Sequence, residues 1–431
     1  MADPSQGKKI QPLFISRELI RGESSKSLRR RIGRLPVDRA LEIAAQLFGP
    51  LLALGACLGR NRRGRLGLGS ACLTALISLL LVGCASSGGE SNRSPGERVD
   101  ALFQKYLTEG SPGAAVMVIR EGTVLHSKGY GLADLEAGHP LTPTTPVRLG
   151  SLTKAFTAFA IVLLAEDGEL SYDELASRWV PEIERFPGIT VRHLLNHTSG
   201  LPDYYGGSPL EQLVAATGEE TLFGTAEAIS IYRSWGDPVF GPGERFEYSN
   251  PGYEVLGLIA ERASGRSVGE FLKQTLFDPL GMSTAAFRDH PETILANRAV
   301  GYSPKKLGRG WEENDDHSLN WVMGAGGMYA SLEDLYLWDQ ALGRWAAEGD
   351  RLREVFAPAT LTDGSLSPYG FGWSVSDLGE RAATHHTGAW VGFRSAISRY
   401  EQEGLTVIVL SNCSGPAAEL RDSIAAIYLE L

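Results

Sequence analysis

Cysteine is scarce in this chain of 431 residues, which holds four: Cys57, Cys72, Cys84 and Cys413. So few cysteines at these spacings offer no disulfide framework, and no combination of cysteine and histidine has the spacing of a zinc site. The sequence therefore indicates neither a metal ion nor a cofactor. Cys413 is predicted to be a small residue of the core or of a strand end rather than a nucleophile.

Positive charge is sparse over most of the chain. Residues 66–431 hold 27 Lys and Arg against 46 Asp and Glu, whereas residues 1–65 hold 14 against 5. An acidic body repels phosphates, which argues against nucleic acid as a partner. A basic N-terminal segment before an acidic domain is the charge asymmetry expected of a targeting signal.

A long uncharged stretch occurs at residues 66–83, directly after an arginine-rich run at residues 60–65. A basic segment, an apolar run and small residues before a cleavage point predict a secretory signal. The Leu-Val-Gly-Cys ending at residues 81–84 resembles a bacterial lipobox, so we expect an exported lipoprotein of the cell envelope, held at the membrane by lipid on Cys84. The alternative is a plain membrane-spanning helix, since about 18 apolar residues is the lower limit for crossing a bilayer.

Three segments follow from this interpretation. Residues 1–84 form an N-terminal preface with the signal, unusually long for such a signal. The Ser/Gly/Asn-rich residues 85–95 form a flexible tether. Residues 96–431 form the folded domain, which is long enough to bury a sizeable core.

Strand patterns cluster at both ends of this domain. Hairpins are predicted from hydrophobic runs separated by glycine-containing turns, and terminal helices from amphipathic periodicity. The predicted strands are 115–120, 124–128, 393–400 and 405–410, and the predicted helices are one near 99–107 and one at 416–429. The simplest architecture is an α/β (α+β) fold, with one antiparallel sheet built from both chain ends, flanked by helices, and an inserted, mainly helical subdomain.

Ser151 and Lys154 stand where an almost wholly apolar segment, residues 155–165, begins. A helix that is apolar all round is buried, and at its N-terminus Ser151 would meet free N–H groups that favour negative charge. Lys154 lies on the same helix face, where desolvation would lower its pKa and let it accept a proton. The alternative is a helix-capping serine with a surface lysine.

Tyr248 and Asn250 precede a predicted helix at residues 251–263. A phenol held near cations can serve as a general base, and an amide can bind a substrate carbonyl. The structural alternatives are a tyrosine in the core and an asparagine that caps the helix. His193 and His197, earlier in the chain, are predicted to serve structure at a junction between a helix and a loop.

His386, Thr387 and Gly388 lie just before the predicted strand at 393–400. Backbone N–H groups on the edge of that strand could complete an oxyanion hole with the N–H of Ser151.

The order Ser-x-x-Lys, Tyr-x-Asn and [Lys/His]-Thr-Gly resembles that of the serine β-lactamase and penicillin-binding superfamily. The Tyr-x-Asn form is similar to the branch related to class C β-lactamases, which also contains DD-peptidases, D-aminopeptidases and esterases. Three further stretches resemble that branch, namely residues 193–202 (HLLNHTSGLP), 276–282 (LFDPLGM) and 324–328 (GAGGM). The resemblance covers about residues 98–431.

This resemblance implies a fold and a role for each motif residue. The fold would be that of β-lactamases and transpeptidases, with Ser151 as the nucleophile. Lys154 and Tyr248 would share the general-base work, and Asn250 would position Lys154 and the substrate carbonyl. A rival for the second motif, Ser318-Leu319-Asn320, has the Ser-x-Asn form of other branches.

The third motif departs from the usual pattern. His386 stands where lysine is common, with Thr387 and Gly388 beside it, and the N–H groups of Ser151 and Ala389 would form the oxyanion hole. Histidine is mostly neutral near pH 7, whereas lysine is charged. This difference favours esters, amides or D-amino-acid peptides over efficient β-lactam hydrolysis. Arg394 could supply the missing charge or could simply face solvent.

The leading hypothesis is therefore a serine hydrolase that forms an acyl-enzyme on a small-molecule or peptide substrate. Within the same class, a DD-carboxypeptidase or a β-lactamase is the alternative. A different class of hypothesis is a non-catalytic lipoprotein that binds cell-wall fragments in the same cleft, because fold alone does not fix function.

Overall fold

The structure of the protein, a computed structural model, describes residues 93–202, 236–288, 294–307, 309–315, 323–349 and 352–430. The predicted signal, Cys84 and the rival Ser318-Leu319-Asn320 motif lie outside the described residues. Among the described helices, none has the length and apolar character needed to cross a membrane.

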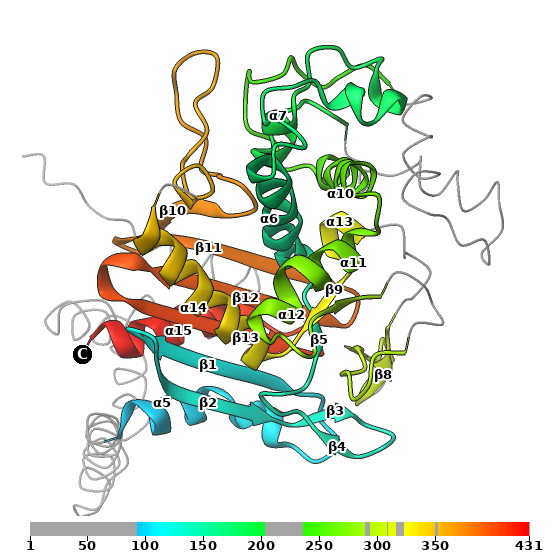
Figure 1. Cartoon of the computed structure of the whole chain (residues 1–431). Coiled ribbons are helices and arrows are strands. Elements are labelled where there is room, and N and C mark those ends of the chain that lie inside the picture. Colours follow the sequence, from blue (N-terminus) through cyan, green and yellow to red (C-terminus); the bar gives the residue numbers. More distant parts are fainter. Residues whose placement is uncertain are drawn as a thin grey trace, which may run out of the picture. The chain divides into compact units, whose positions relative to one another are not determined.

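A six-stranded antiparallel sheet joins the two ends of the domain, in the order β10-β11-β12-β13-β1-β2 (Figure 1). Its strands are β1 (Ala114–Arg120), β2 (Thr123–Tyr130), β10 (Ser374–Leu378), β11 (Arg381–Trp390), β12 (Phe393–Tyr400) and β13 (Leu405–Ser411). In β1 and β13 nearly every residue is buried on both faces, as expected for central strands covered on either side. The predicted sheet from both chain ends is confirmed.

One face of the sheet is covered by the two terminal helices, α5 (Pro95–Leu102) and α15 (Ala417–Leu429). Val99, Phe103 and Tyr106 pack with the even-numbered residues of β1 in a separate core cluster. The first helix is shorter than predicted, because α5 ends at Leu102 and residues 104–107 form a 3₁₀ turn. Cys413 is buried in this cluster at the end of β13, as predicted.

The other face carries the helical region, whose central element is α6 (Thr153–Glu166). Eleven of its fourteen residues are buried, which confirms the prediction from its apolar sequence. The surrounding helices are α7 (Val191–Leu195), α10 (Asn250–Ser264), α11 (Val268–Leu272), α12 (Asp278–Leu280), α13 (Met323–Gly326) and α14 (Leu332–Glu348). Short strands complete the region: β3 (Leu132–Asp134), β4 (His139–Pro140), β5 (Val147–Arg148), β6 (Ala286–Phe287), β7 (Tyr302–Pro304), β8 (Trp311–Glu313) and β9 (Met328–Ala330).

The helical region and the sheet share one hydrophobic core. Phe156 and Phe159 of α6 pack on Trp338 of α14 with ring centroids 4.9 and 4.8 Å apart. The same cluster includes Ala115, Met117 and Ile119 of β1 and the buried face of α10. This shared core fixes α6 and α10 against each other and thereby positions the site described next.

Candidate functional site

Ser151 lies in a 3₁₀ turn, Gly150–Leu152, immediately before α6. Gly150 adopts a φ of 54°, and a Cβ atom there would lie 2.8–2.9 Å from the backbone N, C and O atoms of Ala389. Only glycine combines this left-handed backbone with so close an approach. The serine turn therefore lies directly against the last residues of β11.

Lys154 is the centre of the cluster and has 0% of its surface exposed. Its Nζ donates to Asn250 Oδ1 at 2.8 Å and to the Ala325 carbonyl at 3.1 Å, and it lies 3.2 Å from Ser151 Oγ. Three acceptors thus surround the amine at hydrogen-bond distance. The alternative of a surface lysine beside a capping serine is wrong.

The first turn of α10 brings the second motif to the same point. Ser249, not Asn250, caps this helix, because the Ser249 side chain accepts the N–H of Gly252 at 3.2 Å. Asn250 is therefore available to Lys154. The ring of Tyr248 is half-buried, with its centroid 4.9 Å from Lys154 Nζ, a distance suited to attraction between a cation and an aromatic face.

His197, which was predicted to serve structure, is a further member of this cluster. It is 1% exposed and has a φ of 58°. Its Nδ1 accepts the N–H of Ser249 at 3.1 Å, and its ring lies 4.2 Å from that of Tyr248. Burial, and then Lys154 and His386, hold the pKa of His197 well below its usual value. Its hydrogen bond to Ser249 fits the predicted structural role, and its contact with Tyr248 is one that the sequence did not predict.

The third motif lies just before β12, as predicted, but it also lies inside β11, a strand that the sequence did not predict. His386 and Gly388 are buried, and Thr387 and Ala389 alternate with them as exposed residues. A Cβ atom at Gly388 would lie 1.8 Å from the Leu149 carbonyl oxygen, so only glycine permits this strand to pack on the segment that precedes Ser151.

His386 is neutral in this setting. Its Nε2 lies 2.7 Å from the hydroxyl of Tyr369 and its Nδ1 lies 2.7 Å from the Thr387 carbonyl oxygen. Since a carbonyl only accepts, Nδ1 carries the proton and Nε2 accepts from Tyr369. Burial, followed by the charge of Lys154, lowers the pKa of His386 to about 3.

Arg394 does not replace the missing cation of the third motif. Its guanidinium donates to the carbonyl oxygens of Trp390 and Phe393 at 2.7 and 2.6 Å, which holds the turn between β11 and β12.

His385, next to His386, lies 2.9 Å from Ser376 Oγ. In the part of the chain that the structure describes, no three His, Cys, Asp or Glu side chains gather in a group that could hold a metal ion.

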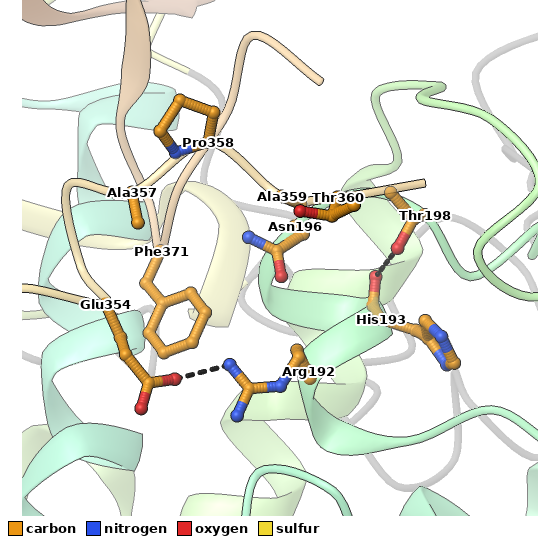
Figure 2. A pocket seen from close by; sticks show the side chains of 10 residues that line it. All are labelled: Arg192, His193, Asn196, Thr198, Glu354, Ala357, Pro358, Ala359, Thr360 and Phe371. Carbon is orange, nitrogen blue, oxygen red and sulfur yellow. Dashed lines mark hydrogen bonds and ion pairs between the residues drawn. The ribbon is translucent and has the colours of Figure 1, made fainter. Parts of the chain in front are cut away.

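A separate cavity of about 290 Å³ lies beside α7 (Figure 2). Its lining includes Arg192, which pairs with Glu354, and Asn196, which donates to the Gly370 carbonyl at 3.1 Å. Its lining includes His193, Asn196 and Thr198 of the 193–202 stretch, but none of the residues of the Ser-x-x-Lys, Tyr-x-Asn and His-Thr-Gly motifs. It is therefore distinct from the candidate active site.

The arrangement can perform nucleophilic chemistry at a carbonyl group. A hydroxyl beside a buried amine, with a phenol and an amide at hand, is the set of groups that activates a serine. The backbone N–H groups of Ser151 and Ala389 belong to segments in direct contact, as an oxyanion hole requires. The predicted residues Ser151, Lys154, Tyr248, Asn250, His386, Thr387, Gly388 and Ala389 come together at this one place.

Comparison with known proteins gives a consistent result. A family model described as Beta-lactamase matches residues 99–430. Penicillin-binding protein 4* of Bacillus subtilis is 33% identical over 334 residues, which are 73% of this chain and 71% of that protein. A D-aminopeptidase of Brucella canis is 31% identical over 322 residues, 74% of this chain but only 60% of that protein. The octameric penicillin-binding protein homologue from Pyrococcus abyssi superposes with a TM-score of 0.66 at 28% identity, covering 78% of this chain and 77% of that one.

Proposed function

The chain belongs to the Beta-lactamase family of serine hydrolases, and we propose that it works through an acyl-enzyme formed on Ser151. The observation that carries this proposal is the position of Lys154. Its fully buried Nζ lies 3.2 Å from Ser151 Oγ while Asn250 and the Ala325 carbonyl hold it from the other sides.

Acylation begins when Ser151 Oγ attacks the substrate carbonyl carbon and its one proton passes to the deprotonated member of the pair Lys154 and Tyr248, which share the general-base work. The substrate oxygen gains the negative charge and is stabilised by the N–H groups of Ser151 and Ala389. The C–N or C–O bond then breaks, and the leaving amine or alcohol takes the proton. Asn250 holds Lys154 in place throughout.

Deacylation repeats these steps with water as the nucleophile. The deprotonated member of the pair Lys154 and Tyr248 removes a proton from the water as its oxygen attacks the acyl carbon. The second tetrahedral intermediate collapses, Ser151 Oγ recovers a proton, and the acid leaves. These two steps need no cofactor, because the protein, the substrate and water supply every atom and proton that they use.

Amides, esters and D-amino-acid peptides are the proposed substrates. Support comes from His386, because a neutral imidazole at the third motif supplies no fixed positive charge for a substrate carboxylate. The similarity to a D-aminopeptidase points in the same direction. A DD-carboxypeptidase or a β-lactamase is the second candidate, favoured by the similarity to penicillin-binding protein 4*.

The proposal can be tested with a fluorophosphonate serine probe on protein that starts near residue 85. Intact mass before and after treatment should show one adduct on the wild type and none on Ser151→Ala. An adduct that persists in Ser151→Ala would refute the assignment of the nucleophile. No adduct on folded wild type would favour the non-catalytic binding protein.

The substrate class can be determined by comparing the two enantiomers of one amide substrate with a penicillin. We expect the D-alanine p-nitroanilide to be hydrolysed faster than its L-enantiomer, with little turnover of a penicillin. Saturable acylation at low penicillin concentration would instead favour the DD-carboxypeptidase or β-lactamase.

We also propose that the protein is an exported lipoprotein. The uncharged run at residues 66–83 and the Leu-Val-Gly-Cys sequence ending at Cys84 support this. Cys84→Ser expressed in a bacterial host should lose incorporation of labelled palmitate and leave the membrane fraction. Labelling of Cys84→Ser equal to that of the wild type would refute the lipid anchor.

A further inference from the structure

Glu254 is a buried carboxyl group on α10 that takes no part in the chemistry described above. It is 1% exposed. Its Oε2 accepts the N–H of Gly324 and its Oε1 accepts the N–H of Ala325, both at 3.2 Å. Each carboxyl oxygen thus holds one of two successive backbone donors, which fixes the orientation of α13, the single helical turn Met323–Gly326.

The same turn is attached to α6 through its carbonyl groups. Ala325 O accepts from Lys154 at 3.1 Å, and Gly324 O accepts from the hydroxyl of Thr157 at 2.7 Å. The N–H groups of the turn therefore point to α10 and its carbonyls to α6. A shift of the turn would move the carbonyl that holds Lys154.

Helix α10 consequently controls two of the contacts of Lys154. Asn250 and Glu254 are four residues apart on one face of this helix. Asn250 contacts Lys154 directly at 2.8 Å, and Glu254 holds the turn that provides Ala325 O. The backbone at Gly324 packs directly on α10, since a Cβ atom at Gly324 would lie 2.1 Å from the Tyr253 carbonyl oxygen.

The carboxyl group of Glu254 and the amine of Lys154 lie in one buried region, and the charge of Lys154 acts on the pKa of Glu254. Burial raises the pKa of Glu254 to about 8, while Lys154 and the two backbone N–H groups act in the opposite direction. Burial of a carboxyl group is unfavourable because the charged form loses its hydration. Such a group with a strongly shifted pKa is therefore expected at a functional position.

We propose that Glu254 is a positioning residue for Lys154: it holds the Gly324–Gly326 turn so that the Ala325 carbonyl fixes the amine beside Ser151. The inference rests on the proposed function, because it assigns Glu254 to the activation of that serine. Misplacement of a catalytic group by about 1 Å can cost 100-fold in rate.

The test measures fluorophosphonate labelling of Ser151 in the full domain, as a maximal rate and a half-saturating concentration. Glu254→Gln keeps one acceptor oxygen but sets an amide donor against a backbone donor, and Glu254→Leu removes both acceptors. We expect maximal rates lower by about 10-fold and about 100-fold, with the half-saturating concentration changed less than about twofold.

Ile259→Ala is the matched control, because Ile259 is fully buried on the same helix and lies outside the hydrogen bonds of the turn. Melting temperatures are measured for all variants. A lower melting temperature in Ile259→Ala with the wild-type labelling rate would separate positioning from general destabilisation.

Two results would contradict the inference. The first is that Glu254→Leu and Ile259→Ala have the same melting temperature and the same reduction in the maximal labelling rate of Ser151. The second is that Glu254→Gln is labelled at the wild-type rate. If Glu254→Leu does not fold, Thr157→Val, which releases the turn from the α6 side, is expected to lower the maximal rate, and an unchanged rate would again contradict it. Wild type that is not labelled at all would refute the proposed function instead.

Discussion

The imidazole ring of His197 packs 4.2 Å from the phenol ring of Tyr248, measured between centroids. His197 also accepts the N–H of Ser249 at 3.1 Å. One buried side chain thus supports both the ring of the candidate base and the backbone that follows it. The left-handed backbone at His197, with a φ of 58°, is of the kind that is kept where surrounding contacts hold it.

His197→Asn is predicted to lower the labelling rate of Ser151 by about tenfold or more, because Tyr248 loses its packing partner. Asparagine tolerates the left-handed backbone, so the fold should persist. His193→Gln is the control, since His193 lies in the same motif but belongs to the capping box of α7. Equal labelling rates in the two variants would contradict a role for His197 at the site.

The central fold was predictable because β1 and β13 are largely apolar runs, and glycine-containing turns mark the hairpins that add β2 and β12. β1, β12 and β13 are buried on both faces, and glycine-containing turns separate them from their neighbours. β10 and β11 were missed. They carry polar residues and lie at one edge of the sheet, so their pairing depends on the tertiary structure rather than on an apolar pattern.

The site was predictable to the extent that it consists of spaced motifs. Ser151, Lys154, Asn250 and His386 meet as the motif order implied. Glu254 and His197 could not be found in this way. Each acts through backbone N–H groups of another segment, and no spacing along the chain reports such a contact.

Stability should fall on acidification through His386. Its pKa in the folded protein, about 3, lies below the usual 6.5 because of burial. Between these values the unfolded chain binds a proton that the folded protein does not, so stability is present above pH 6.5 and is lost as the pH falls. The expected slope is about 1.4 kcal/mol per pH unit for one such group.

The comparison that isolates this effect is His386→Gln, whose amide oxygen can still accept from Tyr369. Urea unfolding at pH 7.5 and pH 4.5 should show that the wild type loses about 2–3 kcal/mol more than His386→Gln. His139→Gln, on the exposed strand β4, controls for the number of histidines. A wild type and a His386→Gln variant with the same pH dependence would show that folding does not lower the pKa of His386.

Gly150→Ala is predicted to damage both stability and activity, whereas Gly168→Ala should affect stability alone. Both glycines have left-handed backbones, with φ of 54° and 77°, at opposite ends of α6. Alanine costs about 1–2 kcal/mol in this conformation. At Gly168 no atom lies within 4 Å of the added carbon, but at Gly150 it would meet the Ala389 backbone at 2.8 Å.

The contact at Gly150 should add about 1–3 kcal/mol of destabilisation, as overpacking does. It should also separate Ser151 from Ala389, whose N–H groups form the proposed oxyanion hole. Loss of one such donor costs about 100-fold or more in rate. Urea unfolding and fluorophosphonate labelling of the two variants measure both effects, and Gly150→Ala that labels like Gly168→Ala would show that the serine turn does not depend on its contact with β11.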